Sequence, residues 1–350
     1  MARIAVVLFN LGGPDSLATV KPFLFNLFND AAILRMAAPL RYLLARLISA
    51  RRAPIAQEIY KQIGGRSPIV EQTEAQARAL DARLGDVGDV QTFLAMRYWH
   101  PLAVDTVTEV RDFAPDQVVL LPLYPQFSTT TTASSLADWR RQAAMANLRA
   151  PTVAVGCYPV QAGLVAAQAD LIRPVLAQAR AGGRPVRLLF SAHGLPQKIV
   201  DGGDPYQWQV EQTVAAVVAA LGEPDLHCST CYQSKVGRLQ WIGPSTEQEI
   251  ALAGRNGDAV VVVPIAFVSE HSETLVELDI DYRDLAEQHG VAGYFRVPAV
   301  ATHEAFIDGL AGLVRDAVGR RSDAVHADGG RRLCPAAWPE CGCVGAPPDA

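Results

Sequence analysis

Short apolar runs alternate with amphipathic stretches along the whole chain. Six runs, several of them rich in β-branched residues, predict strands at Ile4–Phe9, Val90–Ala95, Val118–Leu121, Thr152–Val155, Arg187–Phe190 and Val260–Val263. Alanine-rich stretches between them predict helices at Glu71–Leu84, Leu164–Ala181 and Pro205–Leu221. Because strands that alternate with helices are typical of parallel sheets covered by helices, the predicted fold class is α/β.

The two halves of the chain repeat this pattern. The runs Val118–Leu123 and Val260–Ile265 are alike, and each is followed by a polar segment rich in hydroxyl side chains. We therefore predict two similar Rossmann-like domains, each a parallel sheet flanked by helices. The expected division is an N-terminal domain at 1–157, a C-terminal domain at 158–302, a closing helix at 303–320 and a cysteine-rich tail at 321–350.

Composition narrows the class of protein. Half of the 350 residues are hydrophobic and 19% are charged, which suffices for sizeable cores. A net charge of −5 without a basic stripe gives no reason to expect nucleic acid as a partner. No apolar run approaches the roughly 20 residues that span a bilayer, and Asn10–Pro14 ends the apolar start without a signal-peptide cleavage site. The expected location is the cytoplasm.

An acidic row follows the last predicted strand. Glu270, Glu273, Glu277 and Asp281 recur at helical spacing, and an apolar stripe on the opposite face contains Leu275, Leu278, Tyr282 and Leu285. A solvated helix face is the ordinary interpretation. However, the row contains no lysine at i+4, and it begins where a buried strand ends, the usual place for ligands in α/β sheets. The row therefore predicts a site for a divalent cation, or for protons that leave a substrate.

His193 follows another predicted strand, within the turn Ser191–Pro196. A lone histidine is more often structural than catalytic. A histidine held in a Gly/Pro turn at the carboxyl end of a parallel strand is a better catalytic candidate.

These segments together resemble the ferrochelatases, enzymes that insert ferrous iron into a porphyrin. Ser191–Pro196 and Phe267–Tyr282 are similar to the two signature segments of that family. Further similar segments occur in order at Asn10–Pro14, Arg51–Pro54, Tyr60 with Gly64–Pro68, Arg97–Pro101, Tyr124–Ser128, Gly203–Tyr206, Gln233–Gly237 and Trp241 with Gly243-Pro244.

The resemblance implies a chelatase-like fold with a porphyrin cleft between the two domains. It implies insertion of Fe2+ into protoporphyrin IX to make protoheme, the last step of haem biosynthesis, with porphyrin and ferrous iron as partners. His193 and Glu273 match the family's invariant pair, which would bind Fe2+ and take up pyrrole protons. We expect them to face each other across the ring, with Glu277 and Asp281 as a path for protons leaving it. Since metallation changes no redox state, no NAD and no flavin is expected.

The resemblance also implies how the porphyrin is held. Arg52 and Ser67 match positions that bind propionates, a suitable task for an arginine fork. Arg97 falls inside the pocket. The expected apolar and aromatic walls are Phe9, Leu11, Tyr60 and Trp241.

Residues 33–48 combine large apolar side chains with Arg35, Arg41 and Arg46. A cationic amphipathic helix can lie on a membrane surface, or it can pack on a sheet while its arginines reach water. We predict that this segment forms a hydrophobic lip beside the cleft. Any contact with the inner face of a membrane is then peripheral.

The six cysteines are too few for a disulfide framework in a chain of this length, and their clustering indicates metal binding. The resemblance implies a [2Fe-2S] cluster with Cys334, Cys341 and Cys343 as three ligands. The fourth ligand of the animal enzymes falls at Thr129 here. The candidates that remain are Cys157 and either Cys228 or Cys231, and we favour Cys157, a lone cysteine at the predicted domain boundary. Cys228 and Cys231 would be ordinary buried thiols or half of a zinc site.

Two other functions compete with this interpretation. One is a related chelatase that acts on coproporphyrin III or on another tetrapyrrole or metal. The other is a non-catalytic iron–sulfur or tetrapyrrole-binding protein, which would not need a base and a carboxylate together. The sequence does not indicate an oligomeric state.

Overall fold

The computed structural model describes residues 1–237, 239–320 and 324–348. The first three and last two residues of the expected tail lie outside this range. The chain forms two compact units. Unit 1 comprises Met1–Cys157, Ala311–Arg332 and Gly342–Ala346, and unit 2 comprises Tyr158–Leu310, Leu333–Cys341 and Pro347–Ala350. The C-terminal segment that we expected to be a separate tail is therefore distributed over both units.

Unit 1 contains a five-stranded parallel sheet in the order β2-β1-β3-β4-β9. Its strands are β1 (Arg3–Asn10), β2 (Asp89–Met96), β3 (Gln117–Pro122), β4 (Thr152–Cys157) and β9 (Val325–Ala327). The order reverses between β1 and β3, which makes their carboxyl ends the topological switch point where ligands bind in such sheets. The first four strands contain the predicted runs, whereas β9 was not predicted.

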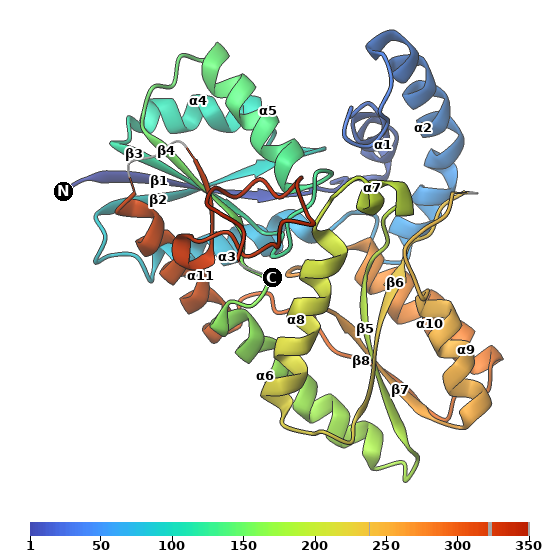
Figure 1. The fold of residues 1–350 in the computed structure, drawn as a ribbon. Coiled ribbons are helices and arrows are strands. Elements are labelled where there is room, and N and C mark those ends of the chain that lie inside the picture. The colour runs from blue at the N-terminus through green and yellow to red at the C-terminus, as the bar shows by residue number, and fades with distance from the viewer. Residues whose placement is uncertain (238, 321–323, 349–350) are drawn as a thin grey trace. The chain divides into compact units, whose positions relative to one another are not determined.

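Helices cover both faces of this sheet. They are α1 (Val20–Phe28), α2 (Ala38–Lys61), α3 (Ile69–Asp81), α4 (Ala103–Phe113), α5 (Thr132–Met145) and α11 (Glu304–Val318). In Figure 1, α4 and α5 lie on one face, α3 and the later part of α11 lie on the other, and α1 packs beside α2. The core residues of β1 and β3 are almost completely buried, because both faces of the sheet are covered.

The segment at 33–48 is helical only in part. Helix α2 begins at Ala38, with Pro39 in its first turn, where a missing N–H costs little, and it continues past Pro54 to Lys61. Leu43 and Leu47 are 64% and 56% exposed. Leu43 and Leu47 therefore do not pack on a sheet, which was one of the two arrangements considered for this segment.

Unit 2 contains a four-stranded parallel sheet in the order β6-β5-β7-β8, the same order as the first four strands of unit 1. The strands are β5 (Val186–His193), β6 (His227–Gln233), β7 (Ala259–Pro264) and β8 (Tyr294–Arg296). The helices are α6 (Ala162–Arg180), α7 (Gln197–Asp201), α8 (Tyr206–Leu221), α9 (Thr246–Asn256) and α10 (Tyr282–Gln288). Helices α6 and α8 cover one face of the sheet, and α9 and α10 cover the other (Figure 1). Its switch point lies between β5 and β7.

The acidic row is not an ordinary α-helix. Residues Glu273–Asp281 form the π-helix η2, which passes directly into α10. In an α-helix, residues four apart are offset by about 40° because a turn takes about 3.6 residues. A π-helix has a wider turn. Residues four apart on η2 are therefore still about one turn apart, so Glu273 and Glu277 lie on neighbouring turns of the helix.

Candidate active site

The candidate site lies at the switch point of the unit 2 sheet. His193 is the last residue of β5, and η2 follows the adjacent strand β7, with Glu273 as its first residue. Parallel strands bring their carboxyl ends to one edge of the sheet, so the topology itself places the histidine and the acidic row together.

His193 and Glu273 are close enough to hold one cation between them. The Nε2 atom of His193 lies 3.7 Å from Oε1 of Glu273, and Nε2 of His271 lies 3.6 Å from Oε2 of the same carboxylate. Glu273 is thus flanked by two imidazoles. His271 was not among the residues predicted for the site.

The hydrogen bonds fix which ring nitrogen of each histidine is available. Nδ1 of His193 lies 2.6 Å from the carbonyl oxygen of Gly194, and Nδ1 of His271 lies 3.2 Å from that of Ser269. A carbonyl only accepts, so Nδ1 carries the proton in both rings. In the neutral rings each Nε2 is then a bare acceptor that faces Glu273. This arrangement suits a proton or a cation held beside the carboxylate.

The imidazoles also set the charge of Glu273. Burial alone raises the pKa of its carboxyl, but the positive charge of a protonated His193 and the contacts of a protonated His271 outweigh burial and lower that pKa to about 2. The side chain remains 27% exposed. Glu273 is therefore an anion at neutral pH and is open to a ligand.

Our expectation that His193 and Glu273 face each other across a porphyrin plane is wrong. A flat ring needs about 3.5 Å of van der Waals distance on each side, so atoms that enclose it lie about 7 Å apart. Nε2 and Oε1 are only 3.7 Å apart. Both groups must act from the same side of a bound ring.

Glu277 lies one step further along η2 and is held by β6 and the loop after it. Gln233 donates its two amide hydrogens to the carbonyl of Glu273 and to Oε2 of Glu277, both at 3.0 Å. Ser234 donates its N–H and its hydroxyl to the Glu277 carboxylate at 2.8 and 2.5 Å. Ser234 has a φ of 64°, a left-handed conformation that is costly for a serine and that typically marks functional positions. Gln233 and Ser234 escaped the sequence analysis as site residues, because amide and hydroxyl side chains carry no signal of their own.

Glu270 and Asp281, at the two ends of the acidic row, lie in different environments from Glu273 and Glu277. Glu270 forms an ion pair with Arg296 at 2.9 Å and accepts the N–H of Ala299, so it is a structural residue. Asp281 is exposed, and within the described part of the chain its side chain has no hydrogen bond and no ion pair. Burial and the nearby Asp284 raise the pKa of its carboxyl. The structure therefore does not connect Asp281 to Glu277.

Trp241 is the one predicted wall residue in the same unit as His193. It bridges to Pro196, and its ring packs on Gly194, where an added Cβ would lie 3.2 Å from the ring and 2.9 Å from the carbonyl oxygen of Gln233. The residue after the histidine must therefore be small for Trp241 to lie beside the site.

The remaining predicted porphyrin contacts belong to unit 1. Phe9 is 1% exposed and packs on Trp139, which favours a role in the core. Tyr60 and Ser67 are buried and Leu11 is half-buried. Arg52 is exposed, with its guanidinium 5.8 Å from the ring centre of Phe28. Of these residues, Arg52 has the most accessible polar group.

Arg97 is held by two carboxylates of unit 1. Its guanidinium lies 2.8 Å from Asp30 and 3.5 Å from Asp138, and its Nε donates to Ser134 at 2.8 Å. Asp30 also accepts the hydroxyls of Tyr98 and Ser134 at 2.9 and 2.6 Å. Asp30 is thus the centre of a buried polar network that orients Arg97, and the sequence pattern did not indicate it.

This network makes a prediction about stability. Burial raises the pKa of Asp30, but Arg97 and the surrounding donors lower it further, with a net decrease. A carboxyl with a lower pKa in the folded state stabilises the fold above its unfolded pKa of about 3.9, and the stabilisation is lost as pH falls through the folded value. We expect Asp30→Asn to lower the free energy of unfolding by about 3 kcal/mol at neutral pH, measured by urea denaturation.

The difference between wild type and Asp30→Asn should shrink once the pH falls below about 4. Asp112→Asn is the control. Asp112 is an exposed carboxylate of unit 1 that pairs with its neighbour Arg111, so its loss should change the free energy of unfolding by less than about 0.5 kcal/mol. Parallel stability curves for wild type and Asp30→Asn down to acid pH would contradict the prediction.

The predicted cluster ligands form a close pair in unit 1. The sulfur atoms of Cys157 and Cys343 are 3.7 Å apart and buried. A disulfide would need about 2.05 Å, whereas two thiolates bound tetrahedrally to one metal at about 2.3 Å lie about 3.8 Å apart. Gly156 permits this approach, since an added Cβ would lie 2.6 Å from the Cys343 sulfur. The pair therefore fits two thiolates on one metal.

The other two predicted ligands belong to unit 2. Cys334 and Cys341 are buried, and Gln209 donates to the Cys334 sulfur at 3.0 Å. A donor aimed at sulfur suits a thiolate. Over the residues that the structure describes, no group of three or more His, Cys, Asp or Glu side chains is placed to hold a metal ion.

Cys228 and Cys231 do not form half of a zinc site. They lie three residues apart in β6, so their side chains point to opposite faces of the sheet. Cys231 is buried in the core, and burial is the main cause that raises the pKa of its thiol to about 12. A thiol with this pKa is not a thiolate ligand.

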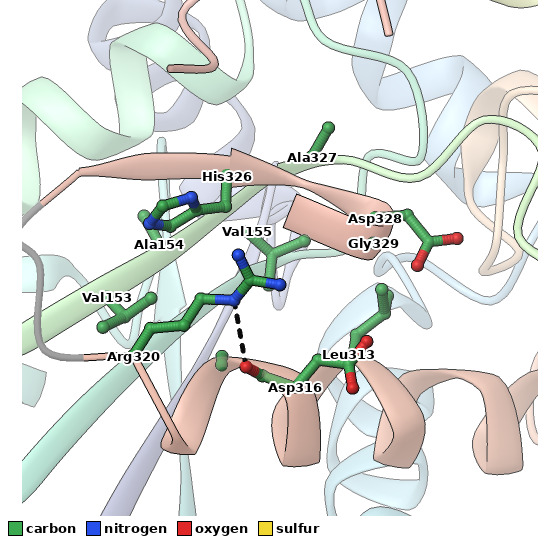
Figure 2. Close-up of a pocket in the computed structure, with 11 residues that line it drawn as sticks. Val153, Ala154, Val155, Leu313, Asp316, Arg320, His326, Ala327, Asp328 and Gly329 are labelled. Carbon is green, nitrogen blue, oxygen red and sulfur yellow. Dashed lines mark hydrogen bonds between the residues drawn. The ribbon is translucent and has the colours of Figure 1, made fainter. Parts of the chain in front are cut away.

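A small pocket in unit 1 contains none of the predicted site residues. It lies between β4, β9 and the end of α11, and Figure 2 shows His326 and Arg320 beside Val153–Val155. It therefore does not compete with the site at β5 and η2.

The fold and the site together define a two-unit α/β protein with an imidazole–carboxylate pair at a switch point. In fold, the chain is similar to a sirohydrochlorin chelatase, SirB, from Bacillus subtilis subspecies spizizenii in complex with cobalt. The TM-score is 0.54 and the identity 10%, with 91% of this chain and 96% of that chain covered. SirB from Bacillus subtilis with Fe3+ gives a TM-score of 0.52 at 10% identity, with 92% and 99% covered.

Sequence comparison identifies the family. The ferrochelatase family model matches residues 3–318. Ferrochelatases of Caulobacter vibrioides and Phenylobacterium zucineum are each 53% identical to the chain, over 346 and 348 residues, which is 97% of this chain and 97% and 98% of theirs. That of Rickettsia bellii is 46% identical over 345 residues, 97% of this chain and 95% of its own. The chain belongs to the ferrochelatase family.

Proposed function

We propose that the protein inserts Fe2+ into protoporphyrin IX to make protoheme, the last step of haem biosynthesis. The observation that carries the proposal is the site of unit 2. There, in a chain of the ferrochelatase family, His193 directs a bare Nε2 at the Glu273 carboxylate from 3.7 Å. Metallation needs an acceptor for pyrrole protons and an anion that attracts the metal, and this pair supplies both.

The chemistry follows from the positions of these groups. Two pyrrole N–H protons must leave as Fe2+ loses its water and binds the four ring nitrogens. His193 accepts a proton at Nε2, because its Nδ1–H is fixed on the Gly194 carbonyl. Glu273, anionic at neutral pH, attracts Fe2+ or holds the resulting imidazolium. Nε2 of His271 lies 3.6 Å from the other oxygen of this carboxylate.

The direct test is anaerobic incubation of the protein with Fe2+ and either protoporphyrin IX or coproporphyrin III, followed through the Soret and Q bands. The expected result is faster metallation of protoporphyrin. Preference for coproporphyrin would favour the related chelatase considered above. Binding of either porphyrin without metallation would refute the enzymatic proposal.

The porphyrin contacts of unit 1 remain part of this proposal. Arg52 is exposed and suits a propionate, for which an arginine offers a planar pair of donors. Arg97 would present its remaining N–H groups from the Asp30 network. Trp241 would supply an apolar wall beside His193.

The cysteines support a [2Fe-2S] cluster as a resident group. Its four ligands would be Cys157, Cys334, Cys341 and Cys343, all of them buried. Bound there, the cluster would link the C-terminal segment to residues distant in the sequence. It supplies no step of the metallation proposed here.

Helix α2 supports peripheral contact with a membrane. Its exposed apolar side chains include Leu40, Tyr42, Leu43, Leu47 and Ile55. Several exposed apolar side chains on one element are costly to keep in water. None of the helices in the described part of the chain has the length and apolar composition needed to cross a bilayer. Contact through α2 would bring the protein to the surface where an apolar porphyrin resides.

We expect the double variant Leu43→Glu/Leu47→Glu to lose most of its binding to liposomes of anionic lipids, measured by sedimentation. Both side chains are more than half exposed, so carboxylates there should not disturb the fold but should oppose insertion. Val104→Glu/Met145→Glu is the control, because Val104 and Met145 are also exposed apolar residues of unit 1 but lie on other helices. Equal lipid binding by the α2 variant and wild type would refute the membrane contact.

A further inference from the structure

Glu277 forms a hydrogen bond with Tyr282, a residue that the predicted path from Glu277 to Asp281 did not include. The hydroxyl of Tyr282 lies 3.1 Å from Oε1 of Glu277 and also 3.1 Å from Oε1 of Glu247, a residue in the first turn of α9. Three ionisable groups from η2, α10 and α9 therefore form one row. Asp281, the next acidic residue along the helix, is not part of it.

Counting hydrogens shows what this row contains. Two hydrogen bonds need two protons, and the Tyr282 hydroxyl has only one. Both hydrogen bonds therefore form at once when one of the two carboxyls holds the second proton. If Glu247 carries it, Glu247 donates to Tyr282, and Tyr282 donates to Glu277. If Glu277 carries it, both donations reverse. The two arrangements have the same atoms and the same charge. They differ only in that one proton moves between Glu277 and Tyr282 while another moves between Tyr282 and Glu247.

We propose that Glu277, Tyr282 and Glu247 form a relay that carries pyrrole protons out of the site. A proton that reaches Glu277 passes to the Tyr282 oxygen as the Tyr282 proton passes to an ionised Glu247. The released proton then leaves from Glu247, a half-buried residue of α9 whose Oε2 is itself buried. This inference rests on the proposed function, since metallation is the source of the protons.

The surroundings of each group fit this task. Burial and the negative charge of Glu273 raise the pKa of the Glu277 carboxyl, which favours its taking up a proton. Burial and the two flanking carboxylates keep the pKa of the Tyr282 phenol far above its ordinary value, so Tyr282 transfers protons without becoming a phenolate. Among the described residues, Oε2 of Glu247 has no hydrogen-bond partner, and Tyr282 is the contact that holds this carboxyl.

Tyr282→Phe tests the relay, because it keeps the buried ring and removes only the hydroxyl. We expect turnover to fall about tenfold to a hundredfold while the affinities for porphyrin and for Fe2+ stay unchanged. Turnover of the variant should recover with rising concentrations of acetate, a small base that replaces the missing acceptor. Glu247→Gln should show the same loss and the same recovery.

Tyr294→Phe is the matched control. Tyr294 is a buried tyrosine of the same core that donates its hydroxyl to the Leu278 carbonyl at 2.6 Å, so the variant loses a comparable hydrogen bond outside the relay. It should keep wild-type turnover and show no response to acetate. An equal loss in Tyr294→Phe, or wild-type turnover in Tyr282→Phe, would overturn the relay.

A second measurement separates the relay from the proposed function. Infrared spectra of the porphyrin-free protein at neutral pH should contain a protonated carboxyl band that shifts in Tyr282→Phe but not in Tyr294→Phe. If wild type metallates porphyrin but has no such band, the relay is wrong and the proposed function stands. If wild type has the band but metallates no porphyrin, the proposed function is wrong, and so is the role of the row in it.

Discussion

His193→Ala should lose at least about a thousandfold in metallation rate while the protein still binds porphyrin. The side chain at the end of β5 offers the bare Nε2 of His193, and alanine removes it together with its 3.7 Å contact to Glu273. The imidazole is needed for proton removal, not for holding the macrocycle, so the loss should appear in turnover and not in affinity. Porphyrin fluorescence quenching measures binding, and the Soret shift measures metallation.

Glu273→Gln should be similarly impaired, since it keeps the shape of the side chain but removes the charge that the two imidazoles stabilise. His289→Ala is the control. His289 is an exposed histidine that caps the end of α10, and its loss should leave turnover unchanged. If His193→Ala remains folded, binds porphyrin and turns over at a near-normal rate, the base is another group. His271→Ala would then be expected to show the large loss, because His271 offers Glu273 the same atom.

Much of the fold could be predicted from the sequence, and the exceptions have physical reasons. The predicted apolar runs lie in β1 to β5 and in β7, and all of these strands except the edge strand β2 are largely buried. Strand β6 was missed because its sequence, His-Cys-Ser-Thr-Cys-Tyr-Gln, is polar and lies at an edge of the sheet. Strands β8 and β9 have only three residues each, and β9 pairs with β4 from more than 160 residues away. No local pattern signals such a pairing.

The site was predicted in part. The resemblance to ferrochelatases pointed to His193 and Glu273, and the strand ends explained why they meet. The side of the ring on which each acts could not be inferred, because it depends on a separation of a few ångströms between two segments 80 residues apart. Tyr282 was assigned to an apolar stripe by its spacing, since periodicity describes a ring and not its hydroxyl. The π-helix was equally hidden, because acidic residues four apart are compatible with both kinds of helix.

The second large effect should follow from loss of the proposed cluster ligands. In Cys157→Ser, we expect the visible absorption and the EPR signal of a reduced [2Fe-2S] cluster to vanish and the melting temperature to fall. Cys157 and Cys343 form a buried pair beside Gly156. Without a cluster bound to both, this pair would no longer connect the C-terminal segment to β4. The same result is expected for Cys334→Ser, Cys341→Ser and Cys343→Ser.

Cys231→Ser is the matched control, because Cys231 is an equally buried thiol of β6 whose raised pKa makes it a poor ligand. It should keep the absorption and EPR signals even if it loses some stability. A cluster that survives Cys157→Ser and disappears in Cys231→Ser would show that the fourth ligand is Cys231. Iron and sulfide analysis of the purified wild type decides the more basic point, since a protein without either would refute the cluster altogether. Because these readouts do not depend on metallation, the cluster and the activity of His193 and Glu273 can be judged separately.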